Sequence, residues 1–95
     1  MRWEDILKDW RRPFLNSAYS RILDIQDRLA GEDDTYWLDN YYEVISIHLR
    51  VLRKLIDESN FKEGIKKLKD ILHEFEQSGY DFEDIEDIKL ELFDE

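Results

Sequence analysis

Cysteine is absent from this sequence of 95 residues, and proline occurs once and glycine three times. Without cysteine, neither a disulfide nor a thiolate metal site is available. No apolar run approaches the roughly eighteen residues that a membrane-spanning helix needs. The first ten residues, MRWEDILKDW, are charged throughout, unlike a secretory signal. These absences predict a soluble, cytoplasmic protein.

Recognisable catalytic groups are also scarce. There is no glycine-rich phosphate loop, and carboxylates are so numerous that no single pair stands out as a general acid and base. His48 is predicted to lie at the margin of the core and His73 on the surface. Asp70 and His73 have the spacing of half a di-metal site, but no second carboxylate–histidine pair accompanies them. We therefore expect no enzyme activity, no cofactor and no metal.

Charge is the strongest bias in the composition. The chain has 24 acidic and 14 basic residues, which gives a net charge of −10. This charge disfavours direct binding to nucleic acid and to anionic membranes, because both depend on Lys and Arg meeting phosphates. A basic protein is the partner that the charge favours, because long-range attraction speeds such an encounter.

Helical periodicity dominates the pattern of apolar residues, and it predicts one all-α domain over residues 1–95. A short first helix would carry Trp3, Ile6, Leu7 and Trp10 on one face, with Pro13 ending it or beginning the next. The second helix has its stripe at Leu15, Ala18, Ile22, Ile25 and Leu29, followed by Gly31 as a C-cap.

The third predicted helix, Thr35–Ser59, is the longest, with Asp34 as its N-cap. It carries two apolar stripes, and a wide apolar arc is typical of a helix with neighbours on more than one side. The first stripe is Leu38, Tyr42, Ile45, Leu49, Leu52 and Ile56, and the second is Val44, Ile47 and Val51. We therefore predict a small bundle of four to five helices around this long central helix.

The fourth helix is predicted from a capping box at Asn60 and Glu63 to Gly79. Beyond it, residues 80–95 form a separable acidic–apolar segment. Ile88, Leu90 and Leu92 alternate with other residues, which suits a strand as well as a helix. A lone strand needs the sheet edge of a partner, so helix is the favoured interpretation.

The most basic and the most acidic stretches of the sequence are adjacent. Residues 70–95 contain eleven acidic side chains and one basic one, Lys89. Residues 50–69 carry a net charge of +4, and the cations of this basic block are Arg50, Arg53, Lys54, Lys62, Lys66, Lys67 and Lys69. Two interpretations stay open for the block: it offsets the acidic segment within the chain, or it is a nucleic-acid patch. The overall negative field favours the first.

Large aromatic residues among acidic ones are typical of protein interfaces. Tyr36, Trp37 and Tyr41 have this setting, with packing in the core as the alternative. Together with the C-terminal segment, they give the candidate partner-binding set, namely Tyr36, Trp37, Tyr41, Phe82, Glu83, Asp84, Glu86, Asp87, Leu90, Glu91 and Phe93.

Two functions fit this pattern. The first is a non-enzymatic interaction module, an accessory subunit or regulator that binds a basic partner such as a nucleic-acid-processing enzyme. The second is an inhibitor that mimics DNA, of the anti-restriction, anti-CRISPR or immunity type, with its carboxylates spaced like phosphates. A homodimer is compatible with either function. The many charged residues and few Gln, Asn and Met residues also suit a thermophile.

Overall fold

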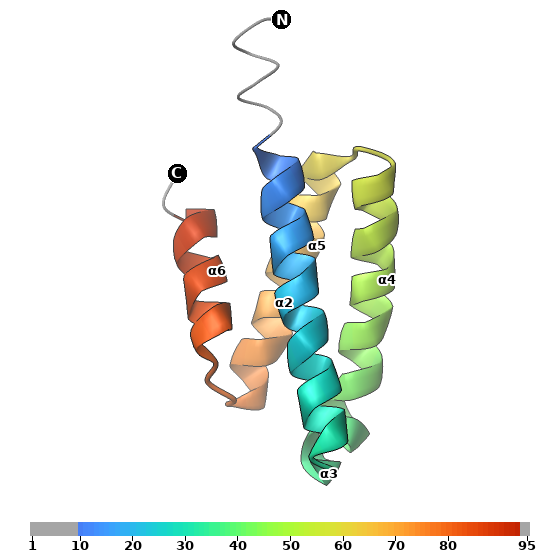
Figure 1. Ribbon diagram of the computed structural model, residues 1–95, viewed down its shortest axis with the longest axis vertical. Helices are drawn as coiled ribbons and strands as arrows, with labels where there is room; N and C mark the ends of the chain where they lie inside the picture. The colour runs from blue at the N-terminus through green and yellow to red at the C-terminus, as the bar shows by residue number, and fades with distance from the viewer. Residues whose placement is uncertain (1–9, 94–95) are drawn as a thin grey trace, which may run out of the picture.

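The computed structural model describes residues 10–93, which form a bundle of four helices (Figure 1). The helices are α2 (Arg11–Gly31), α4 (Glu43–Asp57), α5 (Phe61–Ser78) and α6 (Glu83–Phe93). A short helix, α3 (Thr35–Trp37), and a π-helical turn, η1 (Leu38–Tyr42), lead directly into α4. No residue between 10 and 93 lies in a strand, so the predicted all-α bundle is confirmed.

The first described residue is Trp10. The helix predicted around Trp3, Ile6 and Leu7 lies outside the described residues. Pro13 lies in the first turn of α2, where its missing N–H is not needed by the helix. The ring of Trp10 lies 5.8 Å from that of Phe14, so this aromatic pair covers the start of α2.

α2 and α5 form the centre of the bundle. Each of them packs against the other and against both α4 and α6. They approach closely at Gly64, where a methyl group would lie 3.0 Å from the Leu15 side chain. α4 and α6 lie on opposite sides of this pair (Figure 1). The long helix predicted over Thr35–Ser59 is therefore present as α3, η1 and α4, but it lies at one edge of the bundle.

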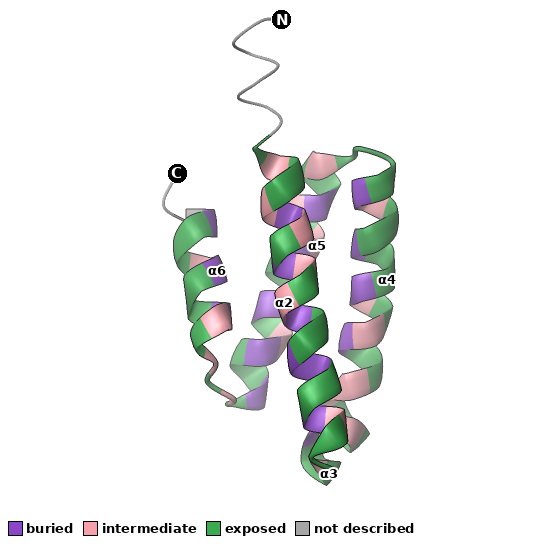
Figure 2. Ribbon diagram, viewed as in Figure 1, coloured by how far each residue is buried: buried purple, intermediate pink, exposed green. Residues whose placement is uncertain are grey.

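The core consists of the apolar sides of all four helices, which face one another in Figure 2. α2 contributes the predicted stripe from Leu15 to Leu29, and α5 contributes Leu68, Ile71, Leu72 and Phe75. The outer sides of α4 and α6 are largely exposed (Figure 2). These two sides are the surfaces that the fold offers to other molecules.

The predicted helix ends are only partly those of the structure. Asp34 does cap α3, because its carboxylate accepts a hydrogen bond of 3.1 Å from the Trp37 N–H. Gly79 ends α5 with a left-handed φ of 78°. The capping box at Asn60 is wrong: Asn60 forms no side-chain capping bond, and Glu63 lies 3.4 Å from Lys66 instead.

The π-turn at η1 changes which residue of this helix enters the core. The predicted stripe begins with Leu38 and Tyr42, yet both are only half-buried, and Trp37 is fully buried instead. A π-turn contains one more residue than an α-turn, so it shifts the register of the helix before it by one position. Trp37 thus takes the place in the core that an unbroken α-helix would give to Leu38.

Gln26 of α2 fixes this arrangement through a buried network. The Trp37 indole N–H donates to the Gln26 side-chain oxygen over 2.6 Å. The Gln26 amide group donates in turn to the Tyr42 carbonyl and to the Ser46 hydroxyl, both over 3.0 Å. A single buried amide therefore ties α2 to the helix before η1, to η1 itself and to α4.

Candidate protein-binding surface

α6 is held in place by its inner side. Ile85, Ile88 and Leu92 are spaced by three and four residues, and all three are buried against α2 and α5. Just before the helix, the Phe82 ring meets Phe75 edge-on at 5.9 Å, and the Arg28 guanidinium lies over Phe82 at 5.9 Å. These contacts make α6 a fixed part of the bundle.

The N-terminus of α6 suits its acidic sequence. Glu83, Asp84 and Glu86 lie in its first turn. The partial positive charge at a helix N-terminus stabilises carboxylates placed there. Several of the negative charges therefore help to form the helix that displays them.

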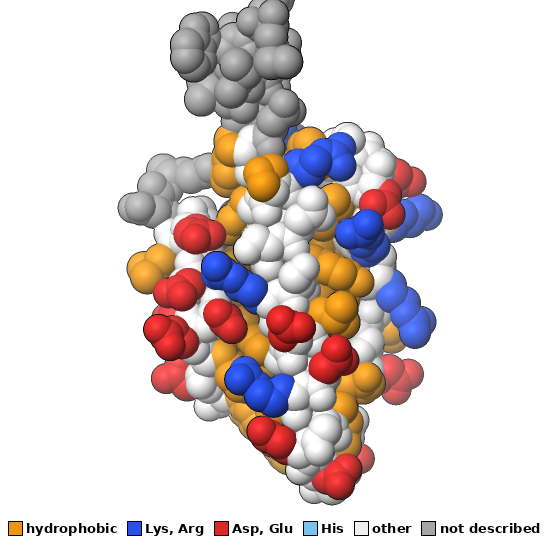
Figure 3. Space-filling view, in the orientation of Figure 1, with side chains coloured by type: hydrophobic (Ala, Val, Ile, Leu, Met, Phe, Trp, Pro, Cys, Tyr) orange, Lys and Arg blue, Asp and Glu red, His pale blue; other side chains and the backbone are white. Residues whose placement is uncertain are grey.

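The outer side of α6 combines acidic groups with an apolar one. Leu90 points away from the core and is 68% exposed, the largest exposure of any large hydrophobic side chain between residues 10 and 92. Glu86 and Asp87 precede it by one helical turn and Glu83 by two, and all three are exposed. We call these four residues the acidic face of α6, where red side chains gather in Figure 3.

The other predicted residues of this segment lie around that face. Glu91 is exposed, Asp84 and Phe82 are half-buried, and of Phe93 only the helical backbone is described. The alternation of Ile88, Leu90 and Leu92 does not form a strand. In the helix, Ile88 and Leu92 turn inward and Leu90 turns outward, so the favoured helical interpretation of residues 88–93 is confirmed.

The aromatic residues predicted to bind a partner divide between core and surface. Tyr36 is 49% exposed, and its ring stacks on Tyr80 at 6.0 Å. Tyr41 is half-buried, with its ring 5.3 Å from that of Trp37. The partner-binding role predicted for Trp37 needs correction, because its side chain is fully buried and presents no surface.

Tyr80 links the start of α6 to the start of α3. Its hydroxyl donates to both carboxylate oxygens of Asp34, at 2.8 and 2.7 Å. This hydrogen bond, with desolvation and the negative charge of Asp34, raises the pKa of Tyr80 to about 12. Hydrogen bonding with Tyr36 raises the pKa of Tyr41 above its ordinary value as well. These hydroxyls stay protonated at neutral pH and help to hold together the aromatic end of the bundle, which consists of Tyr36, Trp37, Tyr41 and Tyr80.

Three cations of the basic block, Arg53, Lys66 and Lys67, form ion pairs within their own helices. Arg53 pairs with Asp57 at 3.4 Å within α4, and Lys67 pairs with Asp70 at 3.6 Å within α5. Lys67 also lies 3.3 Å from the ring of His48, which is half-buried as predicted. These cations compensate acidic groups of their own helices, and Asp70 belongs to the acidic stretch that follows the basic block.

The second apolar stripe of the long helix has a different place from the one predicted. Val44, Ile47 and Val51 are 40%, 51% and 38% exposed, so no neighbouring helix covers them. The interpretation of the wide apolar arc as a sign of neighbours on more than one side is therefore wrong. α2 and α5 both pack on the other side of α4, and the arc continues beyond their reach.

Neither metal-binding nor membrane-spanning features emerge from residues 10–93. This region contains no cluster of three or more His, Asp or Glu side chains that could hold a metal ion. His73 is exposed and lies 3.1 Å from Gln77. None of the described helices has both the length and the apolar character needed to cross a membrane.

Comparisons with other proteins add no assignment to this geometry. No family model matches the chain, and neither the curated proteins nor the solved structures gave a significant match.

Proposed function

We propose that this protein is a non-enzymatic interaction module, an accessory subunit or regulator that binds a basic protein through the acidic face of α6. The observation that carries the proposal is the position of Leu90. It is 68% exposed and lies among Glu83, Glu86 and Asp87 on a helix whose other side is anchored in the core. An apolar residue at the centre of a charged rim is the usual arrangement of a small binding surface.

The two components of this face have different roles in binding. Covering an exposed leucine contributes about 1.5–3 kcal/mol, which holds the partner once the surfaces meet. The carboxylates attract a basic surface over distance and orient it before contact, and this effect weakens with salt. Because α6 is already folded against α2 and α5, little conformational entropy is lost on binding.

The chemistry of the partner follows from the charge. A surface rich in Lys and Arg with a small apolar depression would match the acidic face. Nucleic-acid-processing enzymes carry such surfaces, because they hold phosphates through cationic side chains. We therefore propose a partner of this class.

The alternative of a DNA mimic makes a different demand on the surface. Mimicry needs carboxylates in two rows, whereas here an apolar side chain stands at the centre of the face and Lys89 pairs with Glu86 at 3.7 Å. Salt distinguishes the two roles. Binding that persists at about 1 M salt, where screening reaches within about 3 Å, supports an apolar anchor, and complete loss of binding supports mimicry.

The test uses point variants of the full chain, because removing residues 80–95 would also remove Ile85, Ile88 and Leu92 from the core. Wild-type protein, Leu90→Asp and Leu23→Asp are immobilised and exposed to extract from the native host. Leu23 is the matched control, an exposed leucine on α2 with 39% exposure. We expect the wild type and the control to retain a basic protein that Leu90→Asp loses. Equal capture by all three would refute the proposed surface.

A further inference from the structure

The exposed stripe on α4 is not used by the function proposed above. Val44, Ile47 and Val51 are spaced by three and then four residues, which is the spacing of a seam between two paired helices. Three neighbouring apolar side chains that are each 38% exposed or more form a contact surface on the outer side of α4. We call these three residues the α4 stripe.

The charges beside the stripe have opposite signs at its two ends, and the exposed Arg50 lies between them. Glu43 precedes Val44, and Lys54 follows Val51, and both are exposed. The two residues are eleven positions apart, slightly more than three helical turns, so both side chains lie on the same side of α4 about 16 Å apart. Within residues 10–93, neither forms an ion pair.

We propose that two copies of this chain associate through their α4 stripes as an antiparallel, two-fold symmetric dimer. With the helices antiparallel, Ile47 of one copy meets Val51 of the other. The same arrangement brings Glu43 of each copy to Lys54 of the other, so two identical ion pairs flank the apolar contact. A surface that is complementary to itself in this way defines a closed dimer. A uniformly basic or uniformly acidic partner would instead repel one end of the stripe.

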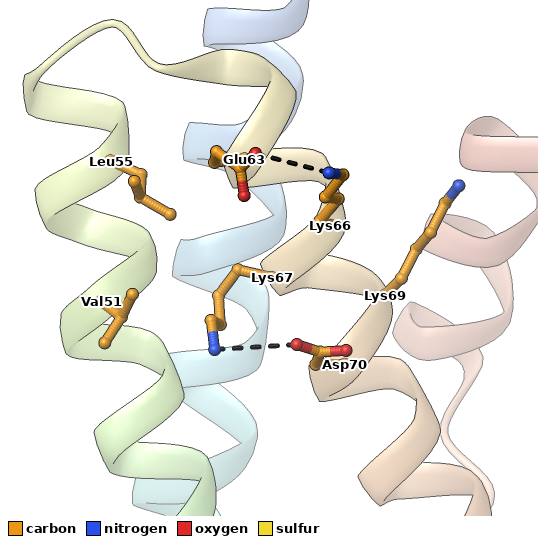
Figure 4. A pocket seen from close by; sticks show the side chains of 7 residues that line it. All are labelled: Val51, Leu55, Glu63, Lys66, Lys67, Lys69 and Asp70. Carbon is orange, nitrogen blue, oxygen red and sulfur yellow. Dashed lines mark hydrogen bonds and ion pairs between the residues drawn. The ribbon is translucent and has the colours of Figure 1, made fainter.

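The surface on both sides of the α4 stripe is hollow and leaves space for the side chains of a second helix. Figure 4 shows Val51 and Leu55 of α4 facing the Glu63–Lys66 and Lys67–Asp70 pairs of α5 across a hollow. A second hollow lies on the other side of the stripe and is lined by Leu38, Tyr42 and Ile47 among others. Ile47 and Val51 therefore form a ridge between two depressions, and ridges of one helix pack into the grooves of another.

The position of the acidic residues also favours this side for self-association. A net charge of −10 makes two copies repel each other. The repulsion is weakest when the acidic faces of α6 lie far apart, and α6 is on the opposite side of the bundle from α4 (Figure 1). Pairing through α4 also leaves both α6 faces accessible.

The first test measures the molar mass of the full chain by sedimentation velocity, from about 1 µM to about 1 mM. We expect a concentration-dependent dimer. Ile47→Glu should weaken it by roughly a hundredfold, because the glutamate would be desolvated at the centre of the contact. Leu90→Glu, on the opposite side of the bundle, should leave it unchanged. Circular dichroism verifies that both variants fold.

The second test determines whether the two α4 helices of the dimer are antiparallel or parallel. Glu43→Lys and Lys54→Glu should each weaken self-association by about tenfold, since each places like charges at both ends of the contact. An equimolar mixture of the two variants should restore the dimer, because every pair is then of opposite sign. A parallel dimer would differ, since Glu43 would already face Glu43 in the wild type, and the single variants would lose nothing.

The proposal is overturned by a wild-type chain that stays monomeric throughout the concentration range. It is also overturned by a dimer that survives Ile47→Glu, which would assign the contact to another surface. Failure of the mixed variants to associate would overturn the antiparallel arrangement. None of these outcomes bears on whether the acidic face of α6 binds a basic partner.

Discussion

α4 and α6 lie on opposite sides of the α2–α5 pair, and their outer surfaces differ. α6 displays one exposed leucine among carboxylates, whereas α4 displays three apolar side chains between an acidic end and a basic end. The first surface is predominantly acidic, with Lys89 as its one cation within the described helix, and therefore suits a different molecule of opposite sign. The other has both signs and suits a copy of itself. The distribution of charge around the apolar residues, more than their number, distinguishes the two.

The two edge helices are also anchored differently. α6 is held mainly by apolar and aromatic contacts through Ile85, Ile88, Leu92 and Phe82. The helix that includes α4 is held in addition by the polar network of Gln26. Substitutions that affect one anchor at a time test this contrast.

The largest expected effect is on the inner side of α6. Ile88→Ala should lower the free energy of unfolding by about 2–4 kcal/mol, because it leaves a cavity among buried side chains. Leu90→Ala, two residues further along, should change it by less than about 0.5 kcal/mol. Urea unfolding followed by circular dichroism measures both. Similar losses from the two variants would contradict the assignment of inner and outer sides.

A somewhat smaller effect is expected from the polar anchor. Gln26→Leu keeps the approximate size of the side chain but removes the partners of the Trp37 indole N–H and the Tyr42 carbonyl. Stability should fall by about 2–3 kcal/mol, the cost of leaving buried polar groups without hydrogen bonds. The matched control is Gln77→Leu, since Gln77 is exposed on α5. A neutral Gln26→Leu would mean that the network adds nothing to apolar packing.

The smallest effect concerns the contact between Tyr80 and Asp34, which joins the two edges at one end of the bundle. Because folding raises the pKa of Tyr80 to about 12, the folded state retains a proton that the unfolded state loses near pH 10. The stabilisation from this contact is complete below pH 10 and disappears as the pH rises towards 12.

Thermal unfolding as a function of pH measures this contribution. Tyr80→Phe should be less stable than the wild type at neutral pH, and the difference should narrow between about pH 10 and about pH 12. Tyr19→Phe serves as the control, because the Tyr19 hydroxyl takes no part in this contact. A gap between wild type and Tyr80→Phe that stays constant with pH would exclude the hydrogen bond as its source.

Helical periodicity was sufficient to predict the bundle and most of its core. The buried apolar stripe of α2 is the one predicted from the sequence, because this helix does not change its winding. The predicted stripe of the third helix was wrong at its start, because η1 inserts one residue there and places Trp37 in the core. No local signal in the sequence marks this turn. Gln26, the hydrogen-bond partner of Trp37, lies on another helix, and the contact exists only after the bundle has formed.

The prediction that neighbouring helices cover the α4 stripe was wrong for a different reason. Periodicity identifies Val44, Ile47 and Val51 as sharing one side of a helix, but it does not count the helices available to cover them. In this bundle α2 and α5 are shared between α4 and α6. The outer face of α6 was easier to anticipate, because carboxylates are rarely buried and the only question was whether Leu90 lay among them.

The π-turn at η1 has one further consequence. An insertion of a single residue in a helix is ordinarily expected to rotate everything on one side of it by about 100°. Here such an extra residue is accommodated, with Trp37 in the core on one side and Ile45 in the core on the other. The helix thus consists of two segments with separate phases. Substitutions on the outer surface of α4 therefore need not change which side chain of α3 faces the core.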